Sequence, residues 1–233
     1  TTARNVRRSP FHDRLVSAGA CMTEAAGFER PGFFAPAGMK PEIEYSYGCQ
    51  NWFDACANEC KNTAENVTLF DHSCFVKFAV DGPDACTVLN HVCANDVDVP
   101  LGKIVYTQWL NGNGGIEADV TVTRLTETSY LVVTISTSQR RDFAWLRRHV
   151  PADAKVFIRD MSSGLPMLAL MGPKSRALLQ AASPADFSNE AFPFGTSKEI
   201  DLGYARVRAS RVTFVGELGW EIYMPAEFAA HVF

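Results

Sequence analysis

The chain has 233 residues, of which 47% are hydrophobic and 21% are charged, so it can bury the core of one large or two small domains. Its formal net charge of −4, without a long run of Lys or Arg, excludes the electrostatic footprint of a protein that binds nucleic acid or an anionic membrane. We therefore expect a small-molecule ligand or a protein partner.

The seven cysteines are odd in number and scattered through apolar stretches, which predicts reduced core thiols. Cys56 and Cys60 have a helical spacing, but no second Cys/His pair accompanies them, so we expect no metal site. Residues 66–68 match a glycosylation sequon, yet free thiols argue against a secreted protein. No apolar run has the length of a membrane span, and we expect a soluble, intracellular protein.

The first 48 residues are dense in Gly, Pro, Arg and aromatic side chains. A short helix fits residues 14–18, whereas the prolines of residues 28–36 indicate an extended arm that packs across another domain. Residues 51–61 then predict a helix. Its expected buried face consists of Trp52, Phe53, Cys56 and Cys60.

Two strands are predicted next, at residues 67–70 and 75–80. Pro83 suits a first helical position and Asp84 favours a helix N-terminus, so a helix should follow. Its expected buried stripe is Ala85, Leu89, Val92 and Cys93.

The stretch 106–125 predicts the hairpin on which the functional interpretation rests. Residues 106–110 form one strand, 111–115 supply turn residues, and 118–125 alternate with a period of two. Asp119, Thr121 and Thr123 should share one strand face. On pattern alone, a structural strand with one wet side is the simpler interpretation.

The pattern of the first half then restarts. Residues 130–135 predict a strand, and Ser138 should cap a helix with Phe143, Leu146 and Val150 inside. Residues 165–171 predict another strand before a helix that opens at residues 172–175. The strand-Gly-Pro-helix unit of residues 75–89 thus recurs at 167–179, which predicts two related αβ units; chance similarity of so short a stretch is the alternative.

After a loop at 185–198, we expect strands at 199–209, 211–215 and 220–224. If the turn at 216–219 closes a regular hairpin, Phe214 lies opposite Glu221.

Two acids in separate hairpins, Asp119 and Glu221, are the candidate functional groups, because no Ser/His/Asp order, phosphate loop or dinucleotide fingerprint is present. His72, in Phe-Asp-His-Ser, is assigned a structural role. A carboxylate can accept two parallel bonds from a planar N–H/NH₂ pair, as in a pterin, and aromatic walls suit a flat ring. A second carboxylate could orient or deprotonate the reacting nitrogens. The aromatic residues expected around the acids are Tyr106, Trp109, Phe214 and Trp220.

Four ordered motifs, at residues 69–73, 80–85, 110–125 and 215–222, resemble the folate-binding aminomethyltransferase-type domain of the dimethylglycine and sarcosine dehydrogenase family, which is similar to the glycine-cleavage T-protein. Residues 9–10, 18–20 and 29–31 resemble the linker that follows the flavin domain there. We therefore expect an α+β fold of antiparallel sheets with helices on one face, incomplete at its C-terminus. The expected parts are a linker arm (1–48), a first folate-binding subdomain (49–155) and a second, truncated one (156–233).

The resemblance implies a function. Asp119 would be catalytic, helping the nitrogen of tetrahydrofolate to attack an imine formed by flavin oxidation of a methylated amine, with 5,10-methylenetetrahydrofolate as product. FAD would lie in an N-terminal domain outside the chain, so we expect this stretch alone to be inactive. The resemblance implies a location in the mitochondrial matrix if the source is eukaryotic; otherwise we expect a cytoplasmic location. The residues implied to bind folate are Tyr106, Thr121, Thr123, Phe214 and Glu221.

The sequence also departs from the family pattern. Phe214 stands where relatives often carry Tyr, Ala118 and Ile135 where T-proteins often carry Asp and Asn, and a later Arg of the folate site would fall beyond Phe233. The alternative function is a non-catalytic regulator that binds a protein partner, like the regulatory subunit of pyruvate dehydrogenase phosphatase. A stand-alone aminomethyltransferase is disfavoured by the linker-like arm.

Overall fold

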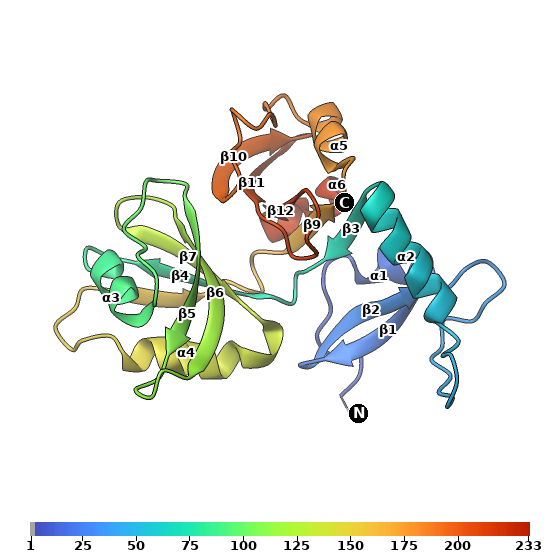
Figure 1. Ribbon diagram of the computed structural model, residues 1–233, viewed down its shortest axis with the longest axis horizontal. Helices are drawn as coiled ribbons and strands as arrows, with labels where there is room; N and C mark the ends of the chain where they lie inside the picture. The colour runs from blue at the N-terminus through green and yellow to red at the C-terminus, as the bar shows by residue number, and fades with distance from the viewer. Residues whose placement is uncertain (1–2) are drawn as a thin grey trace.

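The computed structural model describes residues 3–233; residues 1 and 2 of the predicted arm lie outside the described residues. It contains two five-stranded antiparallel sheets and a two-stranded hairpin (Figure 1). The first sheet has the order β5 (Ile104–Leu110), β6 (Ile116–Arg124), β7 (Ser129–Thr134), β4 (Val76–Asp81), β8 (Phe157–Asp160). The second has the order β10 (Thr196–Leu202), β11 (Ala205–Arg211), β12 (Gly219–Tyr223), β9 (Met167–Met171), β3 (Thr68–Asp71).

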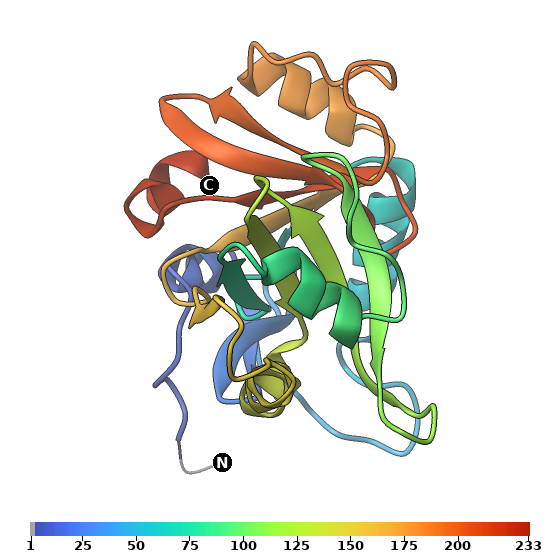
Figure 2. The same ribbon diagram turned by 90° about the vertical axis from the view of Figure 1, so that its left-hand side faces the viewer.

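The helices pack on one face of each sheet. Helices α3 (Ala85–Val92) and α4 (Gln139–Arg148) share the first core with strands β4 to β7, and α5 (Ser175–Ala182) covers the second sheet (Figure 2). The other faces of the two sheets meet through Leu131, Val133, Met167 and Tyr223. The expected α+β fold, with helices on one face of antiparallel sheets, is confirmed.

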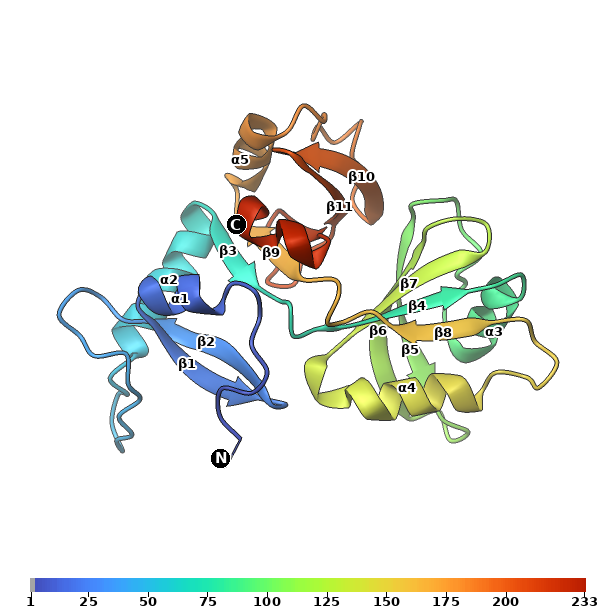
Figure 3. The same ribbon diagram turned by 180° about the vertical axis from the view of Figure 1, so that it is seen from behind.

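The two sheets are repeats of one unit that exchange a strand. Each repeat runs as a short strand, a long strand, a helix, three antiparallel strands and a short 3-10 turn before another helix. The short strand β3 precedes β4 but pairs with β9, whereas β8 precedes β9 but pairs with β4. Figure 3 shows the two segments that cross between the sheets, from β3 to β4 and from β8 to β9. A cut at residues 155/156 would therefore leave each part with one strand of the other part's sheet.

Each repeat has a glycine at the equivalent position, in the turn from its long strand to its helix. Gly82 and Gly172 have φ of +139° and +127°. A Cβ atom at Gly82 would come within 3.0 Å of the Lys155 carbonyl oxygen, and one at Gly172 would come within 3.0 Å of the Asn66 carbonyl oxygen. Lys155 and Asn66 lead into the exchanged strands β8 and β3, so each glycine lets the exchanged chain approach closely.

The tryptophans that we expected beside the acids lie in the cores instead. Trp109 and Trp220 are both 0% exposed, Trp109 in the first core and Trp220 in the second. Trp220 contacts the rings of Phe187 and Phe192 edge to face. Period-two alternation alone does not reveal which strand face is buried, which is why this prediction was wrong.

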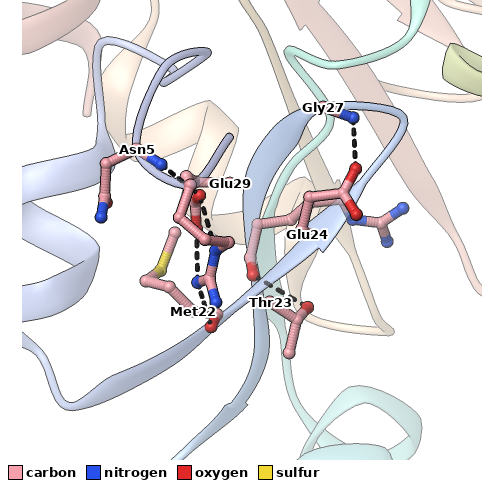
Figure 4. Close-up of polar contacts among 8 residues, drawn as sticks. Asn5, Met22, Thr23, Glu24, Gly27 and Glu29 are labelled. Atoms are coloured by element: carbon pink, nitrogen blue, oxygen red, sulfur yellow. Dashed lines mark hydrogen bonds and ion pairs between the residues drawn. The ribbon is translucent and has the colours of Figure 1, made fainter. Parts of the chain in front are cut away.

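The N-terminal arm is a helix and a hairpin. Helix α1 (His12–Ser17) lies near the helix predicted at residues 14–18. Residues 28–34 are extended, as predicted, but they form strand β2 (Phe28–Phe34), which pairs with β1 (Ala20–Ala25). Pro31 is accommodated because the register shifts near it. Glu29 accepts hydrogen bonds from the Arg4 guanidinium and the Asn5 amide, and Arg4 lowers the pKa of Glu29 to about 2 (Figure 4). The hairpin is thereby tied to the residues before α1.

Helix α2 (Phe53–Glu65) lies near its predicted range, but its buried face differs. Ala55 and Thr63 are buried, whereas Phe53 and Cys60 are exposed. The prediction for Phe53 was wrong because this residue is the first of the helix and its side chain faces solvent. Helix α3 begins two residues after Pro83, and its predicted stripe is buried. Ser138 stands before α4 without a side-chain capping bond.

Two strand predictions near the C-terminus were wrong. Residues 199–209 form parts of two strands, because Gly203 with φ +57° allows a tight turn between β10 and β11. Residues 212–218 are a loop, with only Arg211 of the predicted strand 211–215 in β11. The chain ends in the 3-10 turn η2 (Ala226–Phe228) and helix α6 (Ala229–Val232). Among residues 3–233, no helix has the length and apolar character of a membrane span.

Candidate functional site

The hairpin of β5 and β6 presents a hydrogen-bonded pair of polar side chains. Tyr106 lies opposite Thr121, and Gln108 lies opposite Asp119, so Tyr106 and Asp119 are diagonal neighbours on one face. The Tyr106 hydroxyl donates to Asp119 Oδ2 at 2.6 Å. This bond raises the pKa of the exposed Tyr106 hydroxyl, because only the protonated phenol can donate to the Asp119 carboxylate.

A cavity of about 720 Å³ lies between the two sheets, and residues of helix α4 also line it. Asp119, Tyr106 and Thr121 line it from the first sheet; Phe214 and Glu221 line it from the second half of the chain. Five of the six predicted site residues are thus brought together.

Thr123, the sixth, does not line this cavity. Its side chain is 4% exposed. It shares the strand face of Thr121, but it lies two residues further along β6, opposite Leu131 of β7. Strand parity predicted its face correctly and could not predict where the cavity ends.

Glu221 provides a buried carboxyl group at the inner wall. It lies in the middle of β12, between Ala169 of β9 and Ser210 of β11, and is 7% exposed. Burial raises its pKa, while a hydrogen bond from the Tyr223 hydroxyl to Oε2 and the charge of Lys77 act in the opposite direction. Within residues 3–233 no donor bonds its Oε1, so that atom can accept a hydrogen bond from a ligand.

Phe214 reaches the cavity by a different route from the predicted one. Glu221 pairs with Ser210, so the expected pairing of Phe214 with Glu221 was wrong. Phe214 lies in the loop after β11, where its ring contacts His72 and Phe75 edge to face, with centroids 5.2 Å and 5.4 Å away. The loop still delivers an aromatic ring to the cavity that Glu221 lines.

His72 and Phe75 form the aromatic support on which Phe214 rests. Their rings stack with centroids 4.8 Å apart at an interplanar angle of 9°. Burial lowers the pKa of His72 to about 4, so the imidazole is neutral at physiological pH, in keeping with the predicted structural role. Phe75 lines the cavity, and His72 lines a second one of about 410 Å³ beside the arm and α2.

Lys77 is a buried cation that sequence reasoning missed. It is 0% exposed, and its ammonium donates to the carbonyl oxygens of Ser73 and Phe75, both at 2.8 Å. Burial lowers its pKa to about 8. The two bonds hold the crossing segment between β3 and β4, which carries Phe75. Lys77 lies in an alternating strand, a pattern that predicts an exposed lysine. The sequence therefore gives no sign that Lys77 is buried and holds this segment.

Arg141 is a second missed residue of the cavity. Its guanidinium donates to the Glu117 carbonyl oxygen and to Asp142 Oδ1. Asp142 is 1% exposed and accepts a 2.6 Å hydrogen bond from the Thr134 hydroxyl. In the sequence, Arg141 belongs to a charged run on a helix, which usually means a solvated face.

The lining combines a buried acid, an exposed acid paired with a phenol, and aromatic rings. This donor and acceptor set suits a planar ring that carries N–H donors, since Glu221 can accept from it and Phe75 and Phe214 provide apolar surface. Asp119, with only Oδ2 bound by Tyr106, can orient or accept a proton. No group of three or more metal-ligating side chains occurs among residues 3–233.

Comparisons with known proteins relate the chain to enzymes and to a regulator. The GCVT N-terminal domain matches residues 11–233, which includes most of the segment assigned to a linker arm. The 4-methylaminobutanoate oxidase (formaldehyde-forming) of Paenarthrobacter nicotinovorans is 46% identical, over 99% of this chain and 28% of its own length. The mitochondrial pyruvate dehydrogenase phosphatase regulatory subunit of Mus musculus is 36% identical over 100% of this chain and 27% of its own.

Human mitochondrial sarcosine dehydrogenase is 34% identical, over 95% of this chain and 28% of its own length. The chain therefore spans little more than a quarter of these curated relatives. Among solved structures, the glycine cleavage system aminomethyltransferase T of Bartonella henselae superposes with a TM-score of 0.79 at 24% identity, covering 98% of this chain and 56% of that one. At this identity the likeness shows the fold.

Proposed function

The chain belongs to the family of the GCVT N-terminal domain, and on this basis we propose that its central cavity binds tetrahydrofolate. We infer further that the natural protein is a flavin-dependent oxidase or dehydrogenase of a methylated amine, with FAD held outside this chain. The oxidase and the sarcosine dehydrogenase among its relatives support this inference. The mitochondrial names of several relatives agree with a matrix location in a eukaryotic source.

The observation that carries the proposal is that Asp119 and Glu221, which come from different sheets, line one cavity. Two acids on unrelated strands would not meet by virtue of sequence spacing. A site that collects a buried acid, a second acid and aromatic walls has the features expected for a pterin.

Glu221 is the proposed acceptor for the pterin N–H and NH₂ donors. Its pKa is raised in the free protein because few donors replace the lost water. Bonds from a ligand would stabilise the carboxylate, so binding should favour loss of the proton and weaken as the pH falls. Phe214 and Phe75 would contact the flat ring.

Asp119 is the proposed catalytic residue. Tetrahydrofolate supplies amines that can take up the one-carbon unit of a methylene-iminium product of amine oxidation, giving 5,10-methylenetetrahydrofolate and the demethylated amine. Asp119 would accept the proton released from the attacking amine, while Tyr106 holds its other oxygen in place. Without folate, water would hydrolyse the iminium to formaldehyde, which agrees with a formaldehyde-forming oxidase among the relatives.

The regulatory alternative is supported by the 36% identity to the phosphatase subunit. It requires neither folate binding nor a one-carbon product. The presence of both acids in one cavity supports the enzyme instead.

Calorimetric titration of the protein at its natural length with 5-formyltetrahydrofolate tests the proposal. We expect saturable binding that weakens about tenfold or more in Glu221→Gln, the effect of losing a charge-assisted contact. Glu127→Gln, which changes an exposed acid in the loop after β6, is the matched control and should bind as the wild type does. Circular dichroism would establish that each variant is folded.

In the same preparations, Asp119→Asn should lower the rate of 5,10-methylenetetrahydrofolate formation roughly a hundredfold, which is a typical effect of removing a general base. Amine oxidation should continue, so formaldehyde should accumulate. A folded wild type that binds no reduced folate would refute the folate site and favour the regulatory alternative.

A further inference from the structure

The charges that line the cavity between the sheets are unevenly distributed. Four acids line it: Glu117, Asp119, Asp142 and Glu221. Within the described residues, Arg141 is the single Lys or Arg in this lining. A ligand with N–H donors at one end and an anion at the other would be oriented by such an arrangement, because only one place in the cavity attracts an anion.

Arg141 is held in place by elements of the first sheet. One guanidinium nitrogen donates to the carbonyl oxygen of Glu117 on β6, and Nε lies 3.2 Å from Asp142 Oδ1. Asp142 is fixed in turn by the Thr134 hydroxyl at the end of β7. A guanidinium has five N–H donors, and these contacts leave several of them for a ligand.

The acid and the cation differ in depth. Glu221 is 7% exposed, whereas 59% of the Arg141 side chain is exposed. A ligand that places its N–H donors against the buried Glu221 would extend from that wall through the cavity, and Arg141 is an exposed cation in the same lining. The planar guanidinium is suited to bind a carboxylate through two parallel hydrogen bonds.

We propose that Arg141 binds the carboxylate of the glutamate tail of the folate ligand, and so distinguishes folates from pterins without a tail. This inference rests on the proposed function of the same cavity. It assigns to Arg141 a role in ligand selection, whereas Glu221 is the proposed contact of the ring.

The test compares two ligands that differ in the tail: 5-formyltetrahydrofolate and 6-methyltetrahydropterin, each titrated by calorimetry into the full-length protein. Arg141→Gln should weaken binding of the folate roughly tenfold, the effect of losing a charge-assisted pair, and change binding of the pterin less than about twofold. Arg140→Gln is the matched control, because Arg140 precedes Arg141 on α4 and lines a different depression. It should leave both affinities unchanged.

A wild type that binds both ligands, with equal losses for both in Arg141→Gln, would overturn the inference, since a purely structural arginine would affect both. Unchanged folate binding in Arg141→Gln would overturn it as well. In either case the folate site itself would stand. A wild type that binds neither ligand would refute the proposed function and this inference with it.

Discussion

His72 connects a local aromatic contact to the acid stability of the protein. The imidazole is 8% exposed, stacks on Phe75, and its Nδ1 has no hydrogen-bond partner within residues 3–233. Protonation in the folded state would place an uncompensated charge between two aromatic rings. Burial therefore lowers the pKa from 6.5 to about 4.

This shift predicts how stability changes with pH. Below pH 6.5 the unfolded chain binds a proton that the folded protein does not, so the free energy of unfolding decreases as the pH falls toward 4, by about 3 kcal/mol for His72. His72→Phe, which keeps a ring in the stack, should flatten the urea-unfolding free energy against pH in this window. His91→Gln, on the exposed side of α3, is the control. An unchanged pH slope in His72→Phe would contradict the prediction.

Among single residues, the buried ionisable side chains were the hardest to predict from the sequence. Lys77 and Glu221 both lie in strands whose alternation predicts one polar face, and that face is turned into the space between the sheets. Asp119 lies on the same kind of strand face and is exposed. Both Asp119 and Glu221 lie between two apolar residues, so the local sequence does not separate the exposed acid from the buried one. Burial depends on the sheet that packs opposite.

The turn from long strand to helix is the element that the sequence repeats. Its glycine lets the exchanged strand approach within contact distance of the helix N-terminus. Gly82 and Gly172 each combine a positive φ with a carbonyl oxygen that a Cβ would overlap. Positive φ alone costs a side chain roughly 1 kcal/mol, and overlap with backbone adds more.

We expect Gly82→Ala and Gly172→Ala each to lower the free energy of unfolding by about 3 kcal/mol or more, because both the conformation and the contact are lost. Gly38→Ala is the matched control, since Gly38 has φ +89° and no neighbouring atom lies within 4 Å of the place that a Cβ would occupy. It should cost only about 1 kcal/mol. Equal losses in all three variants, measured by urea denaturation, would show that the close approach contributes nothing.

At the scale of the whole molecule, strand exchange should make the two sheets unfold together. Strand β3 belongs to the first repeat and completes the second sheet, and β8 does the reverse. Neither sheet can lose its strands without exposing an edge of the other. The cavity that holds Asp119 and Glu221 lies between the two sheets, so its geometry depends on this coupling.

Leu89→Ala tests the coupling. Leu89 is 0% exposed in the first core, and its truncation should cost about 3 kcal/mol. Hydrogen exchange of the most protected amides should then accelerate about a hundredfold in β9 and β12 as well as in β4. Leu178→Ala, at a leucine of α5 that is 48% exposed, should change exchange little. Protection in β9 and β12 that stays at the wild-type level would show that the sheets unfold independently.

Local elements and family membership could be predicted from the amino-acid sequence. Short-range periodicity can be recognised in the amino-acid sequence of a single chain. It predicted the alternation over β6, the buried stripe of α3 and the repeated strand-Gly-Pro-helix unit. The motifs around Asp119 and Glu221 also indicated the family, which the match over residues 11–233 shows. The resemblance implied that Tyr106 and Asp119 line one pocket, and both side chains line the cavity between the sheets.

Which of these side chains meet depends on the tertiary structure. The exchange of β3 and β8, the burial of Trp109 and Trp220 and the delivery of Phe214 by a loop depend on pairings between residues far apart in the chain. Arg141 joined the cavity for the same reason, because α4 packs against the sheet that carries Glu117. Hydrophobic periodicity and residue propensity describe one strand or helix at a time. Whether a side chain is buried, and what it contacts, depends on the element that packs against that strand or helix.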